Sequence, residues 1–219
     1  MAARWVTVLR AMRMIDRLRL VQWLSPAFPI GAFAYSQGME VAIAAGDVRD
    51  AAGLHDWIAD VITHGSGRTD AILLAHARRG EDVADHALAL ATSAERLTEM
   101  MEQGRAFGQA IAAITGQAQP PLPYAVAVGH ATRHLDIGTD EVLLHWLQGL
   151  AAQLVSVAVR FVPLGQTEGQ AVLARLGPLI ADRAQLYATA PLSEIGTATL
   201  RADLAAMQHE TLETRIFRS

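Results

Sequence analysis

The sequence predicts an all-α protein built as a single-domain bundle of about ten helices. Apolar residues recur at spacings of three and four along nearly the whole chain, and alanine, the best helix former, is abundant. No alternating run long enough for a strand interrupts this pattern. A chain of 219 residues, 52% of them hydrophobic, can bury one sizeable core, and no internal repeat or linker indicates a second domain.

The spacing predicts each helix in turn. We expect helices over residues 15–24, 35–45, 50–64, 69–79, 82–90, 94–114, 124–135, 140–162, 166–187 and 193–208. The clearest is 50–64, where Asp50 is a candidate N-cap and Gly65 the stop. Its apolar stripe consists of Leu54, Trp57, Ile58, Val61 and Ile62. Short Gly- and Pro-containing connections separate the helices.

We divide the chain into three parts. Residues 1–13 are an N-terminal extension open to disorder, 14–208 the helical domain, and 209–219 a C-terminal tail. Arginines interrupt each apolar run of the N-terminus before it reaches signal-peptide length, so we expect a cytoplasmic protein.

Segment 142–159 raises the question of a membrane. It has no formal charge if His145 is neutral, and as a helix it would span roughly 27 Å. Because His145, Gln148, Gln153 and Ser156 fall along it, the central helix of a bundle is the preferred interpretation. A membrane-associated helical protein is the less favoured alternative.

Missing residue types exclude several kinds of chemistry. The chain has no cysteine, which removes thiolate nucleophiles, Cys-ligated metals and disulfides. All 18 basic residues are arginine, so neither a Schiff-base lysine nor a P-loop lysine is available. A net charge of −4 argues against a nucleic-acid binder that relies on overall positive charge.

The sequence offers no recognisable catalytic constellation. No GxSxG motif is present, and Ser25 and Ser36 are expected to be turn or cap residues. The GSGRTD segment, 65–70, is interpreted as a flexible helix connection with a cap at Thr69 or Asp70.

Carboxylates offer no acid and base pair either. Glu95, Glu99 and Glu102 are expected on a solvated helix face, with Arg96 and Arg105 as partners. This outcome favours a binding role, with an all-α enzyme that has an unrecognised pocket as the alternative.

His130 and His134 are the one pair of histidines with ligand spacing. At i and i+4 they would share a helical face, but no glutamate follows the first histidine as in the zinc-protease motif. Arg133 would also repel a cation, so surface histidines are preferred over a transient metal site.

Two Gly- and Pro-rich clusters stand out from the helical background. In SPAFPIGAFAYSQGME, 25–40, the prolines stiffen the chain and Gly31 lets it bend. In VRFVPLGQTEGQ, 159–170, Pro163 is expected to end the long helix and Gly165 to take a positive φ.

These clusters resemble the UreF family of urease accessory proteins. The first resembles its signature S-P-x-x-P-x-G-x-F-x-Y-S-x-G-L-E, and the second its segment R-x-V-P-L-G-Q-T-x-G-Q. The ending HETLETRIFRS is similar to H-E-T-Q-Y-S-R-L-F-R-S, and the three motifs occur in the right order. Met39 replaces the usual leucine, and Leu212, Glu213 and Thr214 replace Gln-Tyr-Ser.

The resemblance implies an all-helical, dimeric accessory protein without catalytic activity. It implies a chaperone that works with UreD (UreH in some organisms) and the GTPase UreG on apo-urease. That assembly couples GTP hydrolysis by UreG to nickel insertion. The implied chain has no tightly bound cofactor or metal of its own, nickel being handled by the complex, and binds neither nucleic acid nor membrane.

The resemblance also implies partner-binding residues at the matching positions. They are Pro26, Pro29, Gly31, Phe33, Tyr35, Ser36, Gly38 and Glu40; Arg160, Pro163, Leu164, Gly165, Gln166, Gly169 and Gln170; and His209, Glu210, Arg215, Phe217, Arg218 and Ser219. We expect the aromatic residues to serve as anchors and the charged ones to fix orientation.

Two expectations concern the arrangement of these motifs. In the first motif, Pro, Phe and Ile should pack inward while Tyr35, Ser36 and Glu40 lie nearer a partner. The tail, being polar and charged, should fray alone and become ordered on binding UreD.

Overall fold

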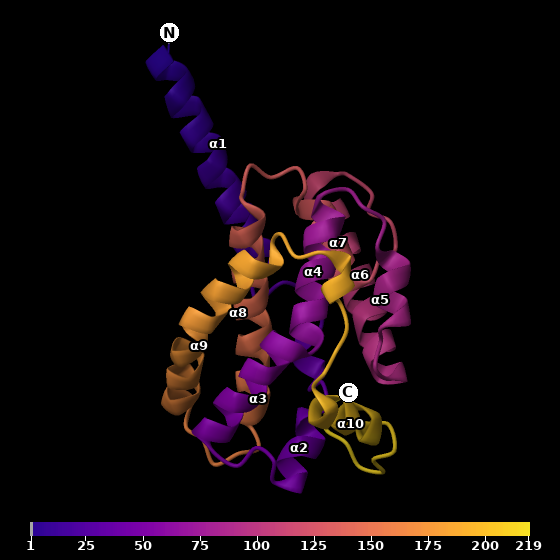
Figure 1. Cartoon of the computed structure of the whole chain (residues 1–219). Coiled ribbons are helices and arrows are strands. Elements are labelled where there is room, and N and C mark those ends of the chain that lie inside the picture. Colours follow the sequence, from indigo (N-terminus) through magenta and orange to yellow (C-terminus); the bar gives the residue numbers. More distant parts are fainter. Residues whose placement is uncertain (1) are drawn as a thin grey trace.

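A computed structural model describes the backbone of residues 2–219 and the side chains from residue 11 onward. Its helices are α1 (Ala2–Trp23), α2 (Met39–Ala45), α3 (Ala51–His64), α4 (Ser66–Arg78), α5 (Ala84–Ala89), α6 (Ala94–Thr115), α7 (Tyr124–Thr132), α8 (Thr139–Ala158), α9 (Gln166–Tyr187) and α10 (Leu200–His209), with short 3-10 turns η1 (Ala32–Ala34) and η2 (Leu192–Glu194). The described residues contain no strand, and the predicted all-α bundle is confirmed (Figure 1).

The core centres on α4, which is buried on nearly all sides. Its residues from Ala71 to Ala75 are inaccessible to solvent, and α3, α7, α8 and α9 pack around it. The apolar helix α8 packs against α2, α3, α4 and α9, which agrees with the prediction of an interior bundle helix. None of the helices in the described part of the chain combines the length and apolarity that a bilayer span needs.

Helix α3 shows how local sequence sets an element. The Asp50 side chain accepts hydrogen bonds from the backbone N–H groups of Ala52 (3.0 Å) and Gly53 (2.8 Å), which would otherwise lack partners at the helix start. The predicted stripe from Leu54 to Ile62 faces the core, and the helix ends at Gly65 as expected.

The helix predicted over 35–45 begins later, at Met39. Tyr35 is extended, and Gly38 has φ +78° and precedes the first helical residue. A Cβ at Gly38 would lie 2.5 Å from the backbone nitrogen of Ala206, so this glycine also permits the close approach of α2 and α10. The bend at Gly31 is confirmed by its φ of +74°.

Other boundaries differ from the prediction because tertiary contacts override spacing. The GSG segment is not a flexible connection, since α4 already begins at Ser66. The helix predicted over 193–208 begins only at Leu200, after η2 and an extended segment. In that segment the carbonyl of Gly196 accepts a hydrogen bond from the Thr69 hydroxyl (3.0 Å). Thr69, expected to cap the helix, therefore contacts this segment instead.

The connection from α8 to α9 corrects two further expectations. Helix α8 ends at Ala158, five residues before Pro163, so the proline does not end it. Gly165 has φ −69°, not a positive value, and its N–H donates to the Glu168 side chain (3.0 Å) at the start of α9. Helix α9 itself has the predicted bounds.

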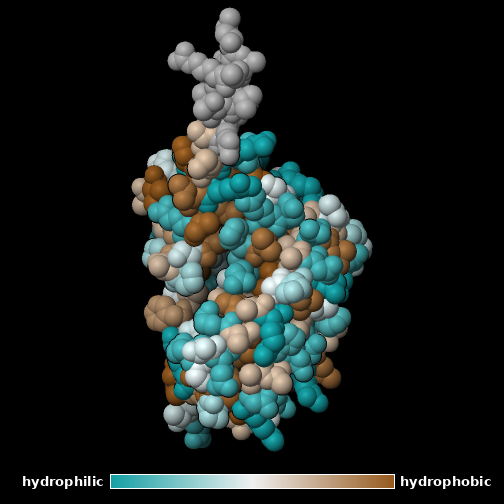
Figure 2. Space-filling view, turned by 90° about the vertical axis from the view of Figure 1, so that its left-hand side faces the viewer, coloured by the Kyte–Doolittle hydropathy of each residue, from teal (hydrophilic) through white to brown (hydrophobic). Residues whose placement is uncertain are grey.

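Helix α1 runs from Ala2 through the predicted extension 1–13 without a break in its backbone. Residue 1 and the side chains of residues 1–10 lie outside the described part, so the proposed boundary at residue 13 stays a prediction. The lower part of α1 is tied to the body by Arg17, which pairs with Glu141 on α8 (2.8 Å). Figure 2 shows apolar surface next to the grey residues. In the described part of α1, Met14, Leu18 and Val21 are exposed.

Candidate functional site

The C-terminal tail lies against the first motif, at the end of the molecule where α2 and α10 meet (Figure 1). The backbone N–H of Ser36 donates to the carbonyl of Ser219 (2.7 Å), and the Ser36 hydroxyl donates to the same oxygen. The N–H of Arg218 donates to the carbonyl of Ala34 (2.8 Å). The expectation that the tail frays in the isolated chain is therefore wrong for this structure, because its backbone has partners in its own chain.

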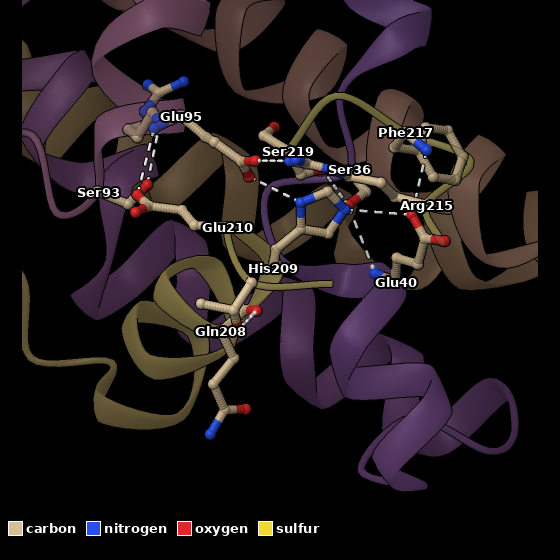
Figure 3. Close-up of polar contacts among 12 residues, drawn as sticks. Ser36, Glu40, Ser93, Glu95, Gln208, His209, Glu210, Arg215, Phe217 and Ser219 are labelled. Atoms are coloured by element: carbon tan, nitrogen blue, oxygen red, sulfur yellow. Dashed lines mark hydrogen bonds and ion pairs between the residues drawn. The ribbon is translucent and has the colours of Figure 1, made fainter. Parts of the chain in front are cut away.

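Glu40 and His209 form the centre of this contact (Figure 3). The Glu40 carboxylate accepts the backbone N–H groups of Ile216 (3.1 Å) and Phe217 (3.1 Å). His209 is fully buried, with Nε2 3.2 Å from Glu40 and Nδ1 2.7 Å from Glu95. Glu95 also pairs with the guanidinium of Arg215. One histidine thus joins α2, α6 and α10.

Helix α6 supplies three carboxylates that sequence reasoning assigned to a solvated face. Glu95, Glu99 and Glu102 stand at positions i, i+4 and i+7 of this helix. The structure places all three against the first motif or the C-terminal tail. Glu102 accepts the Tyr35 hydroxyl (2.5 Å) and pairs with Arg218 (2.7 Å). Glu99 is 0% exposed and accepts from the side-chain amides of Gln37 (3.0 Å) and Gln103 (3.0 Å). Their helical spacing indicated that the three share one face of α6, but gave no signal of what that face contacts.

A buried charge cluster lies under the first motif. Arg96 pairs with Asp70 of α4 and with Glu99 (2.9 Å). Burial raises the pKa of Asp70, although Arg96 opposes that rise. Burial lowers the pKa of Arg96, but attraction to Asp70 and Glu99 outweighs it and raises the pKa overall. Gln37, bound to Glu99, has φ +54°, so the cluster holds a strained residue of the motif in place.

The second motif reaches the tail through aromatic contacts. Phe217 is 4% exposed, its ring centroid lies 5.4 Å from that of Phe161, and the Arg160 guanidinium lies 5.9 Å from the Phe217 centroid. The guanidinium of Arg218 lies 5.4 Å from the Tyr35 ring. The predicted anchor Phe217 therefore binds within its own chain.

The expected orientation of the first motif needs correction. Phe33 is 73% exposed, and both Pro26 and Pro29 are exposed, whereas Tyr35 and Ser36 are buried. Tyr35 faces Glu102, and burial, followed by this hydrogen bond, raises the pKa of its hydroxyl. Two neighbours of these residues follow the prediction, since Phe28 is buried and Ile30 packs on the core.

Gln153 of α8 is a further positioning residue that sequence reasoning missed. Its side-chain amide donates to the carbonyls of Ala32 (3.0 Å) and Tyr35 (3.1 Å), which fixes the turn that carries Phe33. As one polar residue in an apolar helix, it gave no local signal of this role.

The remaining predicted residues divide into buried and exposed sets. Leu164 is buried, and Gly169 is buried because it packs against Val155 and Val159 of α8. Exposed predicted residues are Arg160, Pro163, Gly165, Gln166, Gln170, Glu210, Arg215 and Arg218. Although exposed, Glu210 accepts the backbone N–H of Ala94 (2.6 Å) at the start of α6.

A cavity of about 330 Å³ lies between the first two motifs. Exposed Phe33, Arg160 and Gln170 line its outer part, and Trp146 and Gln103 are among the buried residues that line it. The titratable residues in its wall are Asp70, Arg96, Tyr124, His145 and Arg160, and of these Asp70 and Arg96 pair with each other. They therefore satisfy one another and are not poised as a general acid and base.

The histidine pair does not form the shared helical face that its spacing suggested. Helix α7 ends at Thr132, so His134 lies beyond it, while His130 contacts the Gln119 side chain (2.9 Å). Burial, and then the nearby Arg133 and His134, lower the pKa of His130. Within the described residues no group of three or more His, Asp or Glu side chains could hold a metal ion.

Fold and site together define a helical protein whose three motifs contact one another in a single region. Residues 48–177 match the family model named UreF. A urease accessory protein UreF of Cereibacter sphaeroides (strain KD131) is 62% identical over 92% of this chain and 98% of its own length. Proteins of the same name from Dinoroseobacter shibae and Rhodopseudomonas palustris are 49% and 44% identical, covering 93% and 92% of this chain and 98% and 91% of their own lengths. The chain belongs to the UreF family.

Proposed function

We propose that this chain is a urease maturation factor: a non-catalytic adaptor and chaperone of the cytoplasm. It joins UreD and UreG in a complex that acts on apo-urease, and couples GTP hydrolysis by UreG to nickel insertion. Nickel is cargo of the complex, and the chain works as a homodimer. Membership of a family whose relatives are named urease accessory proteins supports the maturation role.

The observation that carries the proposal is the convergence of the three signature motifs. They lie far apart in the sequence, at 25–40, 159–170 and 209–219, yet Glu40, Phe161 and Phe217 bring them into direct contact. A reaction centre would need free catalytic groups, whereas the carboxylates and arginines here pair with one another. Paired residues that hold loops and a tail in fixed positions are suited to shaping a protein-binding surface.

Exposed parts of the motifs provide the contact surface in this proposal. Phe33 projects at one edge, Arg160 and Gln170 lie on the second motif, and Ile216 of the tail is exposed. An exposed aromatic residue held by a rigid turn is a favourable interface anchor, because it loses little freedom on binding. We assign this surface, with the tail, to UreD, and leave a separate face for UreG.

Replacing Glu40 by alanine tests the link between the motifs and function. The variant should stay folded and dimeric, because Glu40 lies outside the main core, but it should activate co-expressed urease poorly. The measurements are far-UV circular dichroism, light scattering and the nickel content of urease. Unfolding of the variant would instead assign Glu40 a structural role.

A chain ending before residue 209 tests the role of the tail. It should retain its helicity but fail to co-purify with UreD, and urease should then be made without nickel. The matched control is Arg201→Ala, a charge change on the exposed side of α10. Co-purification of the shortened chain with UreD at the level of the control would refute this assignment.

A further inference from the structure

The tail is bound to the body in the way that a receptor binds an extended peptide. Successive backbone N–H groups of Ile216 and Phe217 donate to Glu40, and that of Arg218 donates to the carbonyl of Ala34. The side chain of Ile216 takes no part in this binding, because the residue is 70% exposed. The segment is recognised through its backbone and through the side chains on either side of Ile216.

Three side-chain positions of the tail meet complementary groups. Arg215 pairs with Glu95, and Arg218 pairs with Glu102. Between them, Phe217 enters a pocket against Phe161 and beneath the Arg160 guanidinium. The pattern that the body reads is therefore Arg-x-Phe-Arg.

The groups that receive the tail belong to helices with their own support. Glu95 and Glu102 are on α6, which buries Met100, Phe107 and Ile111 in the body. Glu40 is on α2, which packs against α8 and α10. Without the tail, these three carboxylates would lose Arg215 and Arg218, and the positively chargeable groups that remain near the slot include His209 of α10, Arg105 beside Glu102, and Arg160. An empty slot would thus present three carboxylates beside an aromatic pocket.

We propose that this slot, formed by Glu40, Glu95, Glu102, Phe161 and Arg160, is a recognition site for Arg-x-Phe-Arg peptides. Residues 215–218 occupy it in cis, and a peptide of the same chemistry binds it in trans when they leave. Only a short segment, most of it exposed, joins α10 to residue 215, and such a tether holds its ligand at an effective concentration of roughly millimolar. Peptide binding is therefore masked in the wild-type chain. This inference is independent of the proposed function.

The test uses the full-length chain carrying Phe217→Ala, which weakens the cis ligand and keeps the slot intact. A fluorescein-labelled peptide spanning residues 213–219 is titrated with this variant and followed by fluorescence anisotropy. We expect binding at least about tenfold tighter to the variant than to the wild-type chain, because the tether no longer competes effectively. Binding should weaken as salt is raised, since two ion pairs contribute.

Two matched pairs establish specificity. A peptide with alanine at the position of Phe217 should bind at least about tenfold more weakly than the native peptide. Adding Glu40→Gln to the Phe217→Ala chain should lower affinity similarly, whereas adding Glu194→Gln, a half-exposed glutamate at η2, should not.

Circular dichroism verifies that each variant keeps its helices. If the Phe217→Ala chain loses its helices, the Arg215→Ala/Arg218→Ala chain takes its place in the titration. It should likewise bind the peptide at least about tenfold more tightly than the wild-type chain does. Equal binding of the native and alanine-substituted peptides, or no binding to a helical variant, would overturn the proposal. Because no urease component is present, failure here is distinct from failure of the maturation role.

Discussion

Phe28 and Phe33 show at the residue scale how one motif serves two purposes. Phe28 is buried and packs on Phe107 with 5.5 Å between ring centroids, whereas Phe33 points away from the core. Phe28→Ala should lower the free energy of unfolding by about 3–5 kcal/mol, and Phe33→Ala should change it by less than about 0.5 kcal/mol. Urea unfolding followed by circular dichroism measures both. A large loss for Phe33→Ala would contradict its assignment as a surface anchor.

Glu102 carries a prediction about acid. The Tyr35 hydroxyl, and then Arg218, lower the pKa of Glu102 below its ordinary value of 4.5. A lowered carboxyl pKa contributes stability that is present above pH 4.5 and is lost as the pH falls through the value in the folded protein. The wild-type chain should therefore be more stable than Glu102→Gln near neutral pH, and the two should converge in acid. Parallel urea titrations at several pH values check this, and a constant difference would contradict it.

At the scale of elements, Gly169 determines how closely α9 approaches α8. A Cβ at this position would lie 2.7 Å from Cγ2 of Val159 and 3.0 Å from Cγ1 of Val155. Gly169→Ala should therefore cost about 1–3 kcal/mol through overpacking. Gly149, inside α8, would place a Cβ 3.8 Å from the carbonyl oxygen of Leu24, which is an ordinary contact, so Gly149→Ala is the control and should gain up to about 1 kcal/mol. Urea midpoints measure both, and equal effects would show that helix propensity, not packing, dominates.

Helix α6 illustrates how much of an element its sequence can reveal. Its bounds follow from spacing, and Ser93 caps it by accepting from the N–H of Arg96 (3.0 Å). Its acidic residues, however, have the composition of a solvated face, and contact with Tyr35, Gln37 and His209 turns them toward the motifs. Of the three, Glu99 is buried and the other two are partly exposed. Burial of Glu99 is possible because Arg96 and two amides satisfy it, and such partners are not evident from composition.

At the scale of the whole molecule, the core predicts cooperative unfolding. One contiguous cluster of apolar residues joins α1, α3, α4, α8 and α9 to Phe217 of the tail, and a smaller cluster lies around Met100 and Val83. We expect a single urea transition, because the helices share this core. Circular dichroism should report the same midpoint as tryptophan fluorescence, to which buried Trp23, Trp57 and Trp146 contribute. Separate midpoints would show that the smaller cluster unfolds independently.

The sequence by itself determined the fold class, most helix positions and the family, because helical spacing and short motifs are local properties. The N-cap at Asp50, the helix end at Gly65 and the three motifs could all be identified without tertiary information. Only the tertiary structure decided that Phe33 faces outward, that Glu95, Glu99 and Glu102 face the motifs, and that the tail docks on Glu40. The physical reason is that a charge or an aromatic ring is buried only where partners distant in sequence compensate it, and spacing along the chain does not report those partners.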